Sequence, residues 1–122
     1  MSAIVLNPAC VKTLSAVEAE PIRSNQHEFN GVSQLKQIFG TKTFSRTAKF
    51  SIRGTNITAQ ADVTWYDARA AHPVRSEYRL YFQTNPVMSQ AQAGDNIVIG
   101  LSGNQLHVIL IKAGTSNHIT AN

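Results

Sequence analysis

The alternation of apolar and polar residues with a period of two constrains the fold of this chain more than any other feature. Between residues 48 and 65, apolar side chains alternate with polar ones on both sides of a Gly-Thr-Asn segment at 54–56. This pattern is typical of a β-hairpin. Further runs of strand type lie at residues 10–17, 76–83, 96–101 and 106–112. Six or more short strands predict a small closed or partly closed β-barrel.

One short helix is expected early in the chain. Val32, Leu35, Ile38 and Phe39 have the spacing of one apolar helix face, and Gly40 is a residue type that commonly ends a helix. At 122 residues, 43% of them hydrophobic, the chain has the length and apolar content of one domain. We therefore predict a single domain over residues 1–122, with its core at about 10–112.

The charge of the chain suits a polyanionic partner. Eleven Lys and Arg residues against seven Asp and Glu residues give a net charge of +4, and the basic residues gather at 23–53 and 69–79. The single cysteine, Cys10, excludes an internal disulfide and is expected to be a small buried residue. The chain begins without a signal-peptide pattern and has no apolar run of membrane-spanning length, so we expect a cytoplasmic protein without a membrane partner.

A polar segment at residues 23–31, the first arm, carries side chains of the types that read base edges. Its polar members are Arg23, Ser24, Asn25, Gln26, His27, Glu28 and Asn30. We interpret it as a loop that leads into the helix and contacts bases. The alternative is a surface loop whose Asn and Ser residues only cap the helix, but one cap needs one residue and several polar ones accumulate here.

A second polar segment at residues 67–79, the second arm, ends in a strand. Alternation places Arg75, Glu77 and Arg79 on one strand face, where a carboxylate can orient the arginine side chains. The alternative is a solvated strand face with an ordinary salt bridge. By the same alternation Trp65 is expected in the core and Tyr66 on the outside.

No catalytic, metal or cofactor site is expected from the residue pattern. The four histidines lack metal-ligand spacing. Asp67, Glu77 and Arg79 resemble the two carboxylates and lysine of a Mg²⁺-dependent nuclease, but an arginine cannot give up its proton as a lysine can. A small Mg²⁺-dependent homodimeric endonuclease, and a protein-interaction barrel with a basic surface, remain the alternative functions.

Several of these segments together resemble the B3-like pseudobarrel DNA-binding domains of restriction endonucleases. The domains of this type include the N-terminal effector domain of EcoRII and the C-terminal recognition domains of BfiI and NgoAVII. The resemblance covers about residues 10–112. It is carried by residues 12–15, 25–31, 35–40, 65–69, 75–79 and 94–95.

The resemblance implies a mainly β pseudobarrel of about seven strands with short helices, whose two arms grip duplex DNA from the major groove. It implies sequence-specific recognition without catalysis, in a prokaryotic cytoplasm. The partners would be double-stranded DNA and a nuclease domain in the same or another chain. Besides the first arm, the implied DNA contacts are Asp67, Arg69, Arg75, Ser76, Glu77, Tyr78 and Arg79. Candidate phosphate contacts from the basic residues are Lys36, Lys42, Arg46, Lys49 and Arg53.

Overall fold

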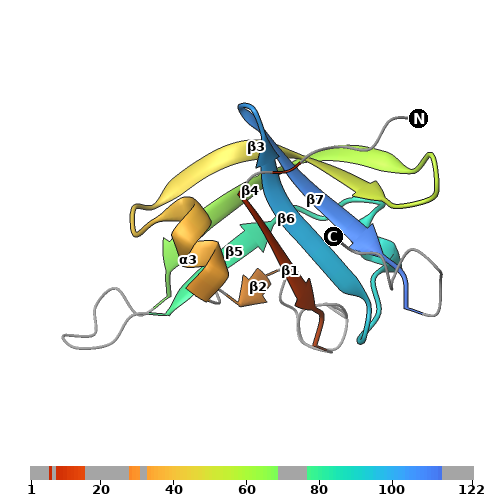
Figure 1. The fold of residues 1–122 in the computed structure, drawn as a ribbon, viewed down its shortest axis with the longest axis horizontal. Coiled ribbons are helices and arrows are strands. Elements are labelled where there is room, and N and C mark those ends of the chain that lie inside the picture. Colours follow the sequence, from red (N-terminus) through yellow and green to blue (C-terminus); the bar gives the residue numbers. More distant parts are fainter. Residues whose placement is uncertain (1–5, 7, 16–27, 31–32, 69–76, 114–122) are drawn as a thin grey trace.

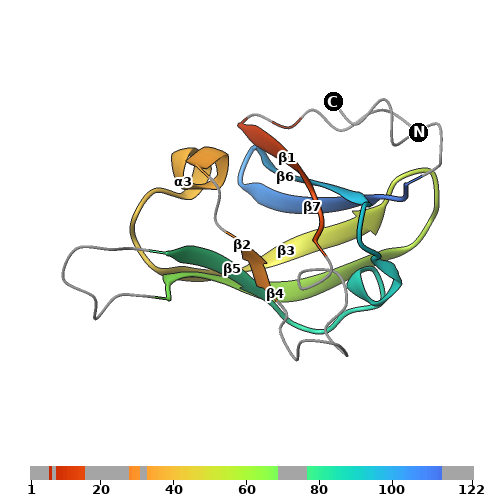
Figure 2. The ribbon, with the colours of Figure 1, turned by 90° about the horizontal axis from the view of Figure 1, so that it is seen from below.

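The computed structural model describes residues 6, 8–15, 28–30, 33–68 and 77–113. The strands of this part of the chain form one seven-stranded sheet with the order β1-β6-β7-β3-β4-β5-β2. Figures 1 and 2 show that the sheet curls into a half-barrel, with β1 and β2 at its two edges. The prediction of a mainly β, barrel-like fold is confirmed. Within the same residues, no helix has the length and apolar character needed to cross a membrane.

The elements follow one another with short connections over most of the described chain. They are β1 (Ala9–Thr13), β2 (Glu28–Asn30), α3 (Ser33–Phe39), β3 (Phe44–Ile52), β4 (Thr58–Asp67), β5 (Tyr78–Phe82), the 3-10 turn η1 (Met88–Gln90), β6 (Asn96–Ser102) and β7 (Gln105–Ile111). Neighbouring strands are antiparallel, except that β3 and β7 pair in parallel. This parallel pair joins the two hairpins β3–β4 and β6–β7 into one sheet.

The local predictions of turns and helix are confirmed. The segments 54–56 and 102–105 connect antiparallel strand pairs, as their glycine and asparagine content indicated. Helix α3 ends at Phe39, and Gly40 follows with a φ of 76°, where its N–H donates to the Lys36 carbonyl at 2.7 Å. A positive φ favours glycine, which explains why the helix stops there.

The prediction that residues 23–31 form a loop throughout is wrong for residues 28–30, which form β2. The cause is Phe29, the one large apolar residue of the segment. Its side chain is fully buried, and its ring stacks on Phe82 of β5 with centroids 4.7 Å apart. Burying an aromatic ring of this size contributes enough free energy to draw its neighbours into strand pairing with β5.

The core fills the concave side of the sheet. Its largest fully buried side chains include Trp65, Phe29, Phe50 and Phe82, and Cys10 is buried as expected. Helix α3 lies next to β1 and adds Leu35 to this core. The period-two pattern of β3, β4 and β5 turns their apolar side chains into this core. Strands β6 and β7 are instead buried on both faces, and Val98, Ile109 and Ile111 form a second cluster with Leu6.

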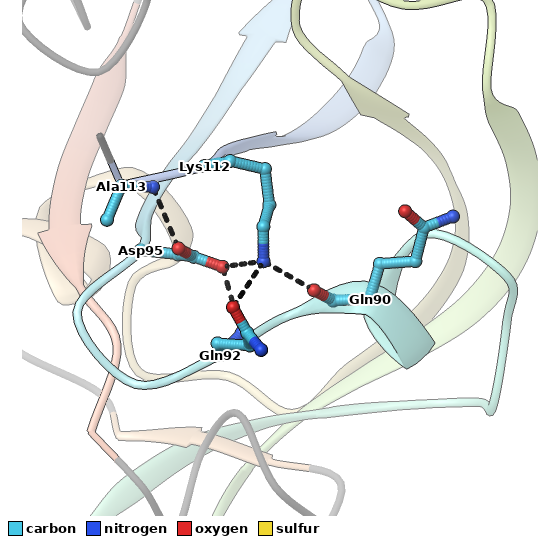
Figure 3. A network of polar contacts seen from close by, with 5 residues as sticks. All are labelled: Gln90, Gln92, Asp95, Lys112 and Ala113. Atoms are coloured by element: carbon cyan, nitrogen blue, oxygen red, sulfur yellow. Dashed lines mark hydrogen bonds and ion pairs between the residues drawn. The ribbon is translucent and has the colours of Figure 1, made fainter. Parts of the chain in front are cut away.

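A polar network around the buried Asp95 carboxylate ties the start of β6 to the end of β7 (Figure 3). The Asp95 carboxylate accepts hydrogen bonds from the backbone N–H of Gln92 at 2.9 Å and of Ala113 at 2.8 Å. Lys112 Nζ lies 2.6 Å from Asp95 Oδ2 and also donates to the Gln90 carbonyl at 2.6 Å. The network fixes the turn before β6 to the residue after β7.

Candidate nucleic-acid interface

Strand β5 presents the polar residues of the second arm on the outer face of the sheet. Leu80 and Phe82 point into the core, whereas Glu77, Arg79 and Tyr81 alternate onto the other face, as predicted. Arg79 Nη2 donates to Glu77 Oε2 at 2.6 Å. The two side chains are 26% and 40% exposed, and Arg79 Nε is buried. This salt bridge is common to both interpretations of the segment, base reading and an ordinary solvated strand face, so the choice between them stays a prediction.

The base of the second arm is closed by two hydrogen bonds. The Ala68 N–H donates to the Glu77 carbonyl at 2.7 Å, and the Glu77 N–H donates to Asp67 Oδ1 at 2.7 Å. Asp67, predicted as a DNA contact, thus uses a carboxylate oxygen to hold the strand that carries Arg79. Its side chain positions the arm.

Tyr78, also predicted as a DNA contact, packs against the core side of the sheet. Its ring stacks on Trp65 with centroids 5.2 Å apart, and its hydroxyl donates to the Thr41 carbonyl at 2.8 Å. Trp65 in turn donates from Nε1 to the Gly40 carbonyl at 3.0 Å. These contacts connect the end of α3 to the base of the second arm. Trp65 is fully buried in the core, as predicted. Tyr66, predicted on the outside, is half-buried and lies opposite Arg79 in the sheet.

The first arm and the second arm meet in the sheet. Strand β2, the described end of the first arm, pairs with β5 so that Asn30 lies opposite Arg79 and Glu28 opposite Tyr81. Glu77 therefore precedes the Tyr78 end of β5, whereas Glu28 lies opposite Tyr81, toward the other end of the strand. Arg79 lies between these two positions on β5.

The other predicted arm residues lie outside the described part of the chain. They are Arg23, Ser24, Asn25, Gln26 and His27 of the first arm, and Arg69, Arg75 and Ser76 of the second.

The five candidate phosphate contacts do not form one patch. Lys36 lies near the second arm, with Nζ 5.2 Å from the centroid of the Tyr78 ring. The exposed Lys42 lies in the loop whose Thr41 carbonyl accepts the Tyr78 hydroxyl. Both lysines are thus placed by Tyr78, whose side chain packs on the core side of β5, opposite the face that carries Glu77 and Arg79.

The remaining three basic residues are distributed along β3. The Arg46 guanidinium donates to the Asn104 carbonyl in the β6–β7 turn. Lys49 is exposed in the middle of the strand, and Arg53 follows its far end. At about 3.3 Å per residue, this strand spreads the charges over roughly 25 Å.

Two residues of the outer face were not singled out from the sequence as site residues. Tyr81 is 42% exposed, and Thr64 of β4 is its cross-strand partner. Alternation from Arg79 was the available signal for Tyr81. Thr64 becomes its neighbour only through the pairing of β4 with β5.

Among the described residues, no group of three or more His, Cys, Asp and Glu side chains is arranged to hold a metal ion. Comparison with protein-family models finds no match to this chain, and comparison with curated proteins finds no relative.

Proposed function

We propose that this chain is a sequence-specific recognition module for double-stranded DNA, of the B3-like pseudobarrel type found in restriction endonucleases. It grips the major groove with two arms and leaves cleavage to a nuclease domain in the same or another chain. The observation that carries the proposal is the Glu77–Arg79 pair on the outer face of the sheet, with Asn30 of the first arm opposite Arg79.

The chemistry of this pair suits base reading. A guanidinium donates to guanine O6 and N7, and a carboxylate accepts from the cytosine amino group, so the two together match a G·C pair. Because Glu77 already holds Arg79 by a charge-assisted bond at 2.6 Å, less side-chain entropy is lost on binding.

The dimensions of the face between the arms also fit a duplex. The five residues of β5 extend over roughly 13–17 Å at about 3.3 Å per residue, which is comparable to a major groove about 12 Å wide. We assign Lys36 and Lys42, which lie near Tyr78 at the base of the second arm, to phosphates at the edge of the duplex. Phosphate contacts of this kind position the duplex, while the arms supply sequence preference.

Selection of binding sites from a random duplex pool, followed by sequencing, tests the proposal. We expect one enriched sequence. On that cognate duplex, Arg79→Ala should cost about 1–3 kcal/mol and relax specificity, whereas Lys42→Ala should weaken binding to all duplexes alike and reduce the salt slope by about 1. Failure to enrich any sequence, or equal losses on cognate and random duplexes for Arg79→Ala, would contradict it. Mg²⁺-dependent plasmid cutting by the purified chain would contradict the absence of catalysis.

A further inference from the structure

We propose that a row of hydroxyl groups on the outer face binds the sugar–phosphate backbone of the duplex, beside the bases read by Arg79. The hydroxyl row consists of Tyr81 on β5, Thr64 on β4 and Ser45 on β3. This inference rests on the proposed function, because it requires the same face of the sheet to meet DNA.

Strand register brings the three side chains together. Tyr81 pairs with Thr64, and Thr64 pairs with Ser45, so the row runs straight across three neighbouring strands. At about 4.8 Å between strands, it covers roughly 10 Å. Arg79 lies on the same face two residues before Tyr81 on β5. The row therefore extends the surface of the second arm sideways toward β3.

The exposure of Tyr81 indicates a contact surface. At 42% it is, with Val11 of β1, one of two exposed large apolar side chains in the described part of the chain. A tyrosine exposes an apolar ring together with a hydroxyl, and this combination suits a deoxyribose next to a phosphate.

The other two hydroxyls are arranged to donate outward. Ser45 Oγ and Thr64 Oγ1 lie 2.9 Å apart, so one of them donates to the other. The hydroxyl that accepts in this pair keeps its own hydrogen for a second acceptor. A phosphate oxygen is such an acceptor, and neutral hydroxyls are common donors to it.

The next outward-facing residue pair on β3 and β4, Thr47 and Asp62, marks the limit of the hydroxyl row. There Thr47 Oγ1 donates to Asp62 Oδ1 at 2.9 Å, and both residues are exposed. The Asp62 carboxylate would repel a phosphate, and the Thr47 hydroxyl already donates to it. Contact with the sugar–phosphate backbone of DNA is therefore expected at the hydroxyl row and on the side of that row where Arg79 lies.

The test is the double variant Ser45→Ala/Thr64→Val in the full chain. Strands β3 and β4 provide a matched control, because Ser51 and Thr58 form the same kind of cross-strand pair six residues along β3. We expect the test variant to weaken binding by about 3- to 30-fold, from one to two hydrogen bonds, with Ser51→Ala/Thr58→Val unchanged. The loss should be equal on cognate and random duplexes, and the salt slope should stay constant because no charge is removed.

Tyr81→Phe gives a second, independent measurement. It removes one hydroxyl from an exposed side chain, so the fold is retained, and we expect roughly a 2- to 10-fold loss on both duplexes. Equal binding by Tyr81→Phe and the unmodified chain, together with equal binding by the two double variants, would overturn the hydroxyl row. Losses confined to the cognate duplex would overturn backbone contact in favour of base contact. If the unmodified chain bound no duplex, the proposed function itself would fail.

Discussion

Substitution of asparagine for Asp95 tests how strongly the polar network around this buried carboxylate holds the sheet together (Figure 3). The Asp95 side chain is only 2% exposed and accepts from Gln92, Ala113 and Lys112. Asparagine keeps the shape and one acceptor oxygen, but it loses the charge and turns an N–H₂ group toward a donor. One charge-assisted bond contributes about 1.5–3 kcal/mol, and a donor left without a partner adds about 1 kcal/mol or more. Since Lys112 is 28% exposed, water compensates part of this loss. We expect the free energy of unfolding to fall by about 2–4 kcal/mol.

The effect of Asp95→Asn should depend on pH in a defined direction. Burial raises the pKa of the Asp95 carboxyl, but the hydrogen bonds from Ala113, Lys112 and Gln92 outweigh burial, and the pKa is lowered below its ordinary value of 3.8. Because the pKa is lowered in the folded state, the stabilisation by the Asp95 carboxylate is complete above its unfolded pKa and is lost as the pH falls through its folded pKa. Urea unfolding should therefore show the full difference at pH 7 and a shrinking difference below about pH 4.

Asp62→Asn is the matched control for this measurement. The Asp62 carboxylate is exposed and accepts a hydrogen bond from Thr47. Loss of this carboxylate should change the free energy of unfolding by about 0.5 kcal/mol or less. The reasoning is refuted if Asp95→Asn costs no more than Asp62→Asn at pH 7, or if acid leaves the Asp95 difference unchanged. A double-mutant cycle with Lys112→Met isolates the ion pair from the two backbone hydrogen bonds.

Two further predictions concern the packing of β6 and β7. A Cβ added by Gly100→Ala would lie 2.7 Å from the Pro8 carbonyl oxygen and 2.9 Å from Ala9 Cβ. We therefore expect the free energy of unfolding in urea to fall by about 1–3 kcal/mol. An unchanged urea midpoint would refute this close approach. Burial, and then the positive charge of Lys49, lower the pKa of His107, which is 6% exposed and whose Nδ1 has no hydrogen-bond partner among the described residues. The contribution of His107 to the free energy of unfolding is therefore fully present above its unfolded pKa of about 6.5, and it decreases as the pH falls below that value. The melting temperature should drop more between pH 7.5 and pH 5.5 for the unmodified chain than for His107→Gln, and equal drops would contradict this.

The features of the fold that the sequence predicted are those set by neighbours in the chain. The hairpin turns, the helix end at Gly40 and the inward face of β5 depend on φ preference and on alternation over a few residues. The parallel pairing of β3 with β7 could not be predicted in this way, because residues such as Phe50 and Val108 are brought together only by the folded sheet. Strand β2 was missed because one buried ring, Phe29, outweighs the polar residues around it.

In the candidate site, too, only the contacts between near neighbours in the chain were predicted. Glu77 and Arg79 are two residues apart on one strand, so their pairing followed from alternation alone. The anchoring role of Asp67 and the packing of Tyr78 on Trp65 depend on contacts across strands, which residue type does not reveal. The basic residues near one another in the sequence were interpreted as candidate phosphate contacts, but the extended strand β3 separates Arg46, Lys49 and Arg53 in space.

The register between the described ends of the two arms, Asn30 and Arg79, is set by the core rather than by the surface. Phe29 holds the end of the first arm in the sheet through its stack on Phe82, and Phe82 belongs to the strand that carries Arg79. The Phe50 ring packs on Phe82 from β3, with centroids 6.2 Å apart. Because cores are close-packed, these rings fix the register of Asn30 against Arg79 within a narrow range. A protein that reads bases through two distant segments needs such a fixed separation, since a displacement of about 1 Å is enough to break a bidentate contact.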